Sequence, residues 1–187
     1  MPSIGIIGAG HIGQAFATAL AKNGVPALLS NSRGPDSLGE TVAAIGPSIT
    51  AGTRDAAAAS DIVFVAVNWS RLPVALAGLP DFAGRIVIDA NNPVEAPLFR
   101  PAELNGRTSS EVFAGLVLKA FNHLPPHLLA GDPRAEGGRR VLFQSGDDTD
   151  AKAVVGRLID QLGFFGIDLG PLAVGARLVQ FPGGPLP

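Results

Sequence analysis

The stretch that decides the fold lies at the amino terminus and reads IGII (4–7) followed by GAGHIG (8–13). The apolar run is typical of a buried strand, and the second segment has the spacing GxGxxG. Apolar residues then recur at helical spacing over 11–23, and Gly24 ends this helix. A strand, a glycine-rich turn and a helix in this order predict the first unit of a parallel α/β sheet.

The three glycines of this segment have separate physical roles in binding a dinucleotide. Gly8 permits the tight turn, Gly10 lets a pyrophosphate approach the backbone, and Gly13 lets the helix pack closely on the strand. The free N–H groups at the start of the helix, around His11 and Ile12, would face the phosphate together with the positive end of the helix dipole. The segment predicts a dinucleotide site, with a glycine-rich turn that binds nothing as the alternative.

The loop after the second expected strand (26–30) predicts which dinucleotide binds. Asn31, Ser32 and Arg33 stand where an NAD-binding domain usually carries an acidic residue. A carboxylate there would bind the ribose hydroxyls of NAD and repel the 2′-phosphate of NADP. Arg33 can instead offer a two-pronged donor to that phosphate and stack on the adenine, while the two neighbours add neutral hydrogen bonds. The sequence therefore predicts NADP(H), with a solvated loop arginine as the alternative.

The rest of the chain alternates between apolar runs and helical patterns. Strands are expected at 61–67, 85–90, 116–121, 139–145 and 164–170. Helices are expected at 37–46, 53–60, 71–79, 109–114 and 147–163, and loops at 91–106 and 132–138. This alternation predicts an α/β fold, a Rossmann doubly wound and mostly parallel sheet. We expect one NADP-binding domain over 1–187, with a small C-terminal addition from about residue 164.

Residues that follow successive strands should lie around the nicotinamide, because open parallel sheets bind ligands beyond the carboxyl ends of their strands. The predicted contacts there are Val67, Asn68, Trp69, Asn91, Asn92 and Asn122. Trp69 would cover a ring or serve as a partly buried packing residue. Asn91 and Asn92 would bind the carboxamide or ribose, or form an Asn-Pro turn.

His123 is the predicted catalytic residue. It follows the strand 116–121 and could donate to a ring carbonyl or protonate a hydride acceptor, although a single histidine can also be structural. Lys119, inside that strand, would hold a charge partner or reach an anionic tail of the acceptor. Thr53 is interpreted as the N-cap of the helix 53–60, and Asp147 and Asp148 are interpreted as helix caps and not as a catalytic carboxylate pair.

Composition excludes several other chemistries. The chain has no Cys and no Tyr, which removes thiolate nucleophiles and the Tyr–Lys pair of short-chain dehydrogenases. Its histidines form no HExxH pattern, so no metal site is expected. A net charge of −2 argues against a nucleic-acid partner, and no apolar run is long enough to span a bilayer. We therefore expect a cytoplasmic protein without a membrane or nucleic-acid partner.

Seven segments occur in the order seen in one known family: IGIIGAGHIG, SNSRGP, AVNWS, VIDANNP, LKAFNHLP, VLFQSGDDTDAK and DLGPLAVGARLVQ. Over nearly its whole length the chain resembles the NADPH-dependent coenzyme F420 reductases (F420H2:NADP oxidoreductases). The resemblance implies hydride transfer between NADP(H) and the deazaflavin F420 by a small protein that usually forms homodimers. A similar KAFN segment occurs in the cytosolic domain of six-transmembrane ferric reductases, where the acceptor is a flavin, and archaeal family members do not typically carry it.

Three functions remain open at this point. The first is an NADPH-dependent oxidoreductase that passes hydride to F420 or a flavin-like ring. The second is a non-catalytic NADP(H) sensor that keeps the nucleotide motifs. The third is a reductase of a small imine or carbonyl compound, although such enzymes usually add a large helical substrate domain for which this chain has no room.

Overall fold

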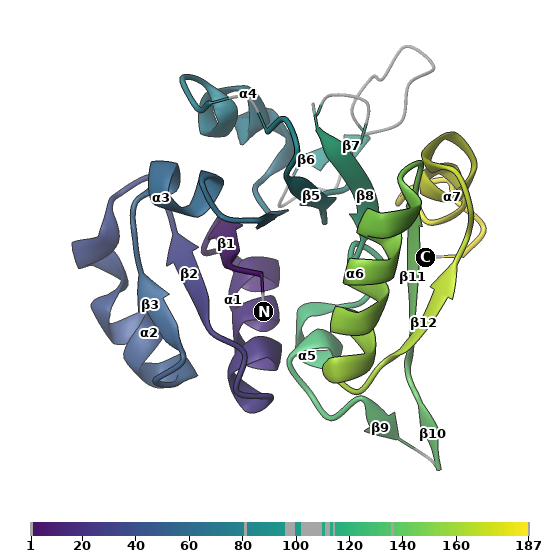
Figure 1. Cartoon of the computed structure of the whole chain (residues 1–187), viewed down its shortest axis with the longest axis horizontal. Helices are drawn as coiled ribbons and strands as arrows, with labels where there is room; N and C mark the ends of the chain where they lie inside the picture. Colours follow the sequence, from purple (N-terminus) through teal and green to yellow (C-terminus); the bar gives the residue numbers. More distant parts are fainter. Residues whose placement is uncertain are drawn as a thin grey trace.

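The computed structural model describes residues 2–80, 82–95, 100–101, 110, 113, 115–135 and 137–186. Its main feature is an eight-stranded sheet in the order β12-β11-β8-β5-β4-β1-β2-β3 (Figure 1). The strands are β1 (Ile4–Ile7), β2 (Ala27–Ser30), β3 (Ile49–Ala51), β4 (Ile62–Val65), β5 (Ile86–Asp89), β8 (Leu116–Ala120), β11 (Val141–Gly146) and β12 (Phe165–Asp168). All neighbours pair in parallel except β11 with β8. The predicted doubly wound, mostly parallel α/β fold is confirmed.

Helices cover both faces of this sheet. They are α1 (His11–Lys22), η1 (Pro35–Leu38), α2 (Gly39–Ile45), α3 (Arg54–Ala58), η2 (Trp69–Arg71), α4 (Leu72–Leu76), α5 (Pro126–Leu129), α6 (Thr149–Gln161) and α7 (Leu172–Leu178). Helices α1, α5 and α6 contribute to one apolar cluster, and α3 and α4 contribute to a second. In Figure 1 the sheet runs from β3 at the left to β12 at the right.

Strands in the middle of the sheet are short and apolar because they are covered on both faces. All four residues of β1 and all four of β4 are buried. The larger cluster contains three phenylalanine rings, with Phe16 of α1 stacked on Phe64 of β4 at 3.9 Å and Phe121 packed edge-on against both. Phe64 is the residue before the last of β4 and Phe121 directly follows β8, so two of the three rings come from the ends of these strands.

Two predicted caps are found where the sequence placed them. The Thr53 hydroxyl accepts the backbone N–H of Ala56 at 3.1 Å and begins α3. The Asp148 carboxylate accepts the N–H of Ala151 at 2.7 Å and begins α6, while Asp147 accepts the N–H of Leu172 at 3.0 Å, at the start of α7. Each acid satisfies a backbone donor that the helix itself leaves unpaired.

Some elements differ from the sequence expectation. Strand β3 and helices α5 and α7 were not predicted, since each is short and begins near proline or lacks a clear period. The expected loop at 132–138 contains the hairpin strands β9 (Arg134–Ala135) and β10 (Gly138–Arg139), which pair antiparallel.

The expected loop at 91–106 contains two short strands, β6 (Val94–Glu95) and β7 (Arg100–Pro101), which pair antiparallel. Most of that segment, and most of the expected helix 109–114, lies outside the described residues. Within the described residues, no helix combines the length and the hydropathy that a membrane crossing requires.

Candidate functional site

The glycine turn between β1 and α1 is tightly packed on one side and open on the other. A Cβ added to Gly13 would lie 1.8 Å from the Gly8 carbonyl oxygen, so only glycine allows this contact between helix and turn. A Cβ added to Gly8, whose φ is +112°, would lie 2.1 Å from the Ala66 carbonyl oxygen. By contrast, a Cβ on Gly10 would meet no atom of the described residues within 4 Å. Two glycines therefore shape the turn, and the third leaves its outer side open.

The start of α1 faces this open side with its backbone donors available. Gly10 is the N-cap residue, no side chain of the described residues caps the helix there, and its first turn holds no acidic residue. The helix dipole and the free N–H groups of His11 and Ile12 thus favour an anion. Both side chains lie at the surface or half-buried beside the turn, which fits their predicted position against a phosphate.

The loop after β2 is preformed by its own side chains. The Asn31 carboxamide oxygen accepts the backbone N–H of Arg33 at 2.9 Å, and its nitrogen donates to the Ser37 hydroxyl at 2.9 Å. Ser37 in turn donates to the Gly34 carbonyl at 2.7 Å. Asn31 therefore holds the loop in shape, while Ser32 and Arg33 are exposed. Among the described residues, none forms an ion pair with Arg33, so its guanidinium is free to bind a phosphate.

The β2 loop and the glycine turn are joined directly. The backbone N–H of Gly8 donates to the Ser30 carbonyl at 3.0 Å, and the buried Ser30 hydroxyl donates to the Ile6 carbonyl at 2.8 Å. Ser30, the last residue of β2, therefore uses its hydroxyl inside the sheet. The loop that follows it, Asn31 to Arg33, has no acidic residue, so it offers no carboxylate to a ribose.

The strand order reverses at β1 and β4, which is where open α/β sheets bind ligands. Val67, just beyond β4, lies beside the glycine turn, because its Cγ1 would be 2.9 Å from a Cβ on Gly8. The Val67 N–H donates to the carboxamide oxygen of Asn91 at 2.9 Å, and the Asn91 nitrogen donates to the Val65 carbonyl at 3.1 Å. The Asn91 side chain therefore braces the ends of β4 and β5, and it is buried.

A buried ion pair contacts Asn91 from the neighbouring strands β5 and β8. The Lys119 ammonium of β8 lies 2.9 Å from the Asp89 carboxylate of β5, and neither side chain is exposed. The same carboxylate accepts the Asn91 backbone and side-chain N–H groups at 2.9 and 2.8 Å and the Ser110 hydroxyl at 2.7 Å. Lys119 also donates to the Asn91 carbonyl oxygen. Burial lowers the pKa of Lys119, and the Asp89 carboxylate opposes this shift.

This ion pair answers the question that Lys119 raised in the sequence, because the lysine holds a charge partner inside the protein. The sequence reasoning did not identify Asp89 or Ser110 as part of the site. The signal was present for Asp89: it is the one acid in the apolar run IVID, and Lys119 is the one base in the apolar run LVLKA. Opposite charges in two buried strands must be paired, and β5 and β8 are neighbours in register.

A second set of hydrogen bonds joins the end of β8 to the end of β5. Phe121 has a left-handed φ of +64°, which turns the chain after β8 and directs its ring into the core. The Asn92 nitrogen then donates to the Asn122 carbonyl at 2.8 Å, and the Asn122 nitrogen donates to the Asn92 carboxamide oxygen at 3.0 Å. Asn122 also donates to the Val179 carbonyl at 2.6 Å. We call this arrangement, Asn92 with Asn122, the amide pair.

His123 lies next to the amide pair and is half-buried against β11. Its Nε2 accepts the Phe143 N–H at 3.4 Å, and its ring packs on Phe143 at a centroid distance of 5.1 Å. Burial lowers its pKa, so the neutral form is favoured. A neutral ring that accepts at Nε2 carries its proton on Nδ1, and this atom is buried within the protein. His123 is therefore kept neutral and is a poor acid.

Asn68 and Trp69 follow Val67 at the start of η2. Asn68 is exposed, and Trp69 is half-buried against the smaller apolar cluster. All predicted nicotinamide-side residues thus come from the loops beyond β4, β5 and β8, at one edge of the sheet.

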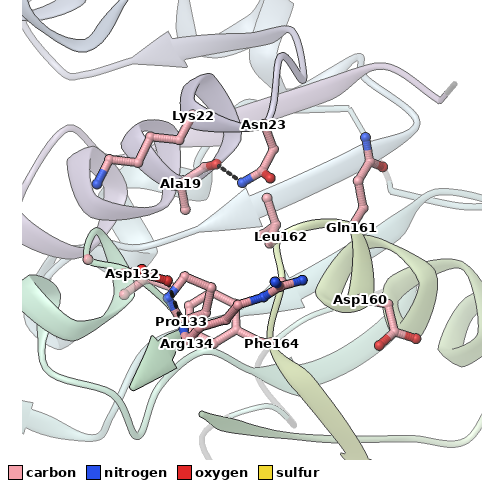
Figure 2. Close-up of a pocket in the computed structure, with 13 residues that line it drawn as sticks. Ala19, Lys22, Asn23, Asp132, Pro133, Arg134, Asp160, Gln161, Leu162 and Phe164 are labelled. Atoms are coloured by element: carbon pink, nitrogen blue, oxygen red, sulfur yellow. Dashed lines mark hydrogen bonds between the residues drawn. The ribbon is translucent and has the colours of Figure 1, made fainter. Parts of the chain in front are cut away.

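A hollow of about 540 Å³ lies elsewhere, between the carboxyl ends of α1 and α6. Figure 2 shows Lys22 and Asn23, at the end of α1, above it and Arg134 below it. The twelve residues of α1 span about 18 Å, so the glycine turn lies at the opposite end of that helix. None of the predicted site residues lines this hollow.

Fold and site together define an NADP-binding Rossmann domain of the oxidoreductase class. Residues 3–93, which hold the glycine turn, the β2 loop and the amide Asn92, match the family described as NADP oxidoreductase coenzyme F420-dependent. The chain belongs to this family.

Individual relatives agree with this class. A hypothetical protein of Sinorhizobium meliloti is 41% identical, with a TM-score of 0.92 over 100% of this chain and 93% of its own. A suggested F420-dependent NADP reductase from Arthrobacter sp. FB24 is 28% identical, with a TM-score of 0.77 over 92% of this chain and 86% of its own. The metalloreductase STEAP3 of Rattus norvegicus is 30% identical over 97% of this chain, which spans 36% of that protein's length.

Proposed function

We propose that this protein transfers hydride between NADP(H) and a planar ring acceptor, either the deazaflavin F420 or a flavin. The observation that carries the cofactor half is the free, exposed Arg33 on a preformed loop directly after β2, beside the glycine turn. A guanidinium at that place favours the additional phosphate of NADP over the plain ribose of NAD.

The residues of this chain mainly bind and orient. When bound, NADPH supplies two electrons and a hydrogen as hydride to the acceptor, which also takes up one proton, and NADP⁺ remains. The start of α1 would hold the pyrophosphate and Arg33 the 2′-phosphate. Val67, Asn68 and Trp69 would then line the nicotinamide, with Val67 fixed by the Asn91 brace.

The acceptor side fits a reaction that depends on geometry more than on acid–base groups. Beyond β5 and β8 the described residues present the amide pair and His123. His123 would lie beside the acceptor ring in its neutral form and help to position it by packing, because burial lowers its pKa and its Nδ1 is buried. Similarity to a suggested F420-dependent reductase supports F420, and similarity to a metalloreductase keeps a flavin open.

The test is a direct assay under anaerobic conditions. Protein and NADPH are mixed in turn with F420, with FMN and with a small cyclic imine, and the nicotinamide absorbance band is followed against a mixture without protein. Oxidation of NADPH by F420 or FMN supports the proposal and names the acceptor. Tight NADPH binding without oxidation would instead identify a sensor, and turnover with the imine alone would identify an imine reductase. Size-exclusion chromatography of the same sample tests the expected homodimer.

A further inference from the structure

The segment that follows α7 is attached to the proposed acceptor edge of the sheet. The Val179 carbonyl accepts a hydrogen bond from Asn122 at 2.6 Å, and the Phe181 backbone N–H donates to the Asn92 carboxamide oxygen at 3.1 Å. Val179 is fully buried, which anchors the start of this segment. Each member of the amide pair thus holds one residue of the carboxyl-terminal segment, and the backbone of Phe181 is fixed beside the loops beyond β5 and β8.

Phe181 is placed unusually for a large aromatic residue. Its side chain is 42% exposed, although Phe16, Phe64 and Phe121 are completely buried. Within the described part of the chain, no aromatic ring or cation stacks on it. An exposed ring on a fixed backbone next to amide groups presents a flat apolar surface beside polar ones.

This combination matches the chemistry of a flavin or deazaflavin ring. Such a ring system is flat and apolar over its face, and it carries carbonyl and N–H groups along one edge. A fixed aromatic side chain can stack on the face, and neighbouring hydrogen-bonding groups can meet the polar edge. We propose that Phe181 is the platform on which the acceptor ring stacks. This inference rests on the proposed function and assigns a residue to its acceptor side.

Phe165 provides a matched control. It is 47% exposed, so the two side chains present similar ring surface to solvent. Phe165 lies at the start of the edge strand β12, where the Arg139 guanidinium covers its ring at 5.2 Å. Neither member of the amide pair contacts it within the described residues. Loss of general surface hydrophobicity should therefore affect both positions alike, and loss of a stacking platform should affect Phe181 alone.

The experiment compares Phe181→Leu, Phe181→Tyr and Phe165→Leu with the unchanged protein. FMN and F420 are titrated in the presence of saturating NADP⁺, with fluorescence of the ring as the readout, and the KM for each acceptor is measured with NADPH. We expect Phe181→Leu to raise the acceptor Kd and KM about tenfold. Phe181→Tyr, which keeps the ring, and Phe165→Leu should stay within about twofold of the unchanged protein, and the Kd for NADPH should not move.

Three results would overturn the inference. The first is an unchanged acceptor Kd in Phe181→Leu, and the second is an equal loss in Phe165→Leu. The third is a loss of self-association in Phe181→Leu with acceptor binding retained, which would place Phe181 between two copies of the chain. If the unchanged protein binds neither ring, the proposed function itself fails and this inference fails with it.

Discussion

The two ends of the proposed ligand site are built in different ways. On the phosphate side, the glycine turn and the β2 loop are short and carry exposed residues, and the β2 loop is held by contacts between residues close in sequence, such as Asn31 with Arg33. On the acceptor side, Asp89, Asn91 and Lys119 are buried and bonded across two strands, and the amide pair reaches the carboxyl-terminal segment.

This difference suggests separate roles: the phosphate side binds the dinucleotide, and the acceptor side holds the loops of the site in position. The exposed side offers free donors to a charged ligand, so changes at Gly10 or Arg33 should alter affinity and leave the fold intact, whereas Gly13 is packed inside the turn. On the buried side, Asp89, Asn91 and Lys119 bond one another within the protein, so changes to them should alter stability first. The predictions below test this separation, beginning with the largest expected effect.

Lys119→Met should destabilise the protein most. It removes the ammonium that lies 2.9 Å from the buried Asp89 carboxylate, which costs about 3–5 kcal/mol of unfolding free energy. Chemical denaturation measures this loss. Lys22→Met, at an exposed lysine, is the control and should cost less than about 1 kcal/mol.

The double variant Asp89→Asn with Lys119→Met removes both charges and should be more stable than Lys119→Met alone. If Lys119→Met lowers the free energy of unfolding no more than Lys22→Met does, the buried ion pair does not stabilise the loops on the acceptor side.

Gly13→Ala should lower the stability of the protein, and Gly10→Ala should lower its affinity for NADPH, although both substitutions lie in the same turn. The new Cβ at position 13 would lie 1.8 Å from a backbone oxygen, so we expect a loss of about 3 kcal/mol in stability. At position 10 it meets no protein atom, so the melting temperature should hold while NADPH binding weakens about tenfold or more. Thermal melts and NADPH titrations measure both effects. Unchanged NADPH affinity in Gly10→Ala would show that the pyrophosphate does not bind at this turn.

Arg33→Ala should weaken NADPH binding by about 2 kcal/mol, or thirtyfold, because a charged hydrogen bond to the 2′-phosphate is lost. NADH binding should not change, since NADH lacks that phosphate. Arg157→Ala removes an exposed arginine from α6 and is the control. An equal loss for NADPH and NADH would show that Arg33 does not bind the 2′-phosphate.

The same separation explains what the sequence could predict. The β2 loop and the caps Thr53 and Asp148 depend on neighbouring residues, and the glycine turn has a fixed spacing, so the local sequence was enough to predict them. The amide pair joins residues 92 and 122 through a left-handed Phe121, and no local pattern predicts such a turn at phenylalanine. Phe181 is 89 residues from its partner Asn92. These contacts depend on which strands become neighbours, which the alternation of elements alone does not specify.

The smallest effect concerns His123 and acid. Its pKa is lowered by burial from the ordinary value of 6.5, so below that pH the unfolded chain binds more protons than the native protein. Stability should therefore fall as the pH drops below 6.5, by at most about 1.4 kcal/mol per pH unit from this one group. His123→Asn should reduce the slope in denaturation experiments across this range, and His127→Asn, at an exposed histidine, should not. A slope unchanged by His123→Asn would mean that this imidazole is not kept neutral.

A crystal structure of the protein with NADP⁺ tests the central claim most directly. We predict pyrophosphate oxygens against the first N–H groups of α1, and 2′-phosphate oxygens about 2.7–3.2 Å from the Arg33 guanidinium. An adenosine ribose whose 2′-phosphate lies away from Arg33, or a dinucleotide bound outside the glycine turn, would contradict the account.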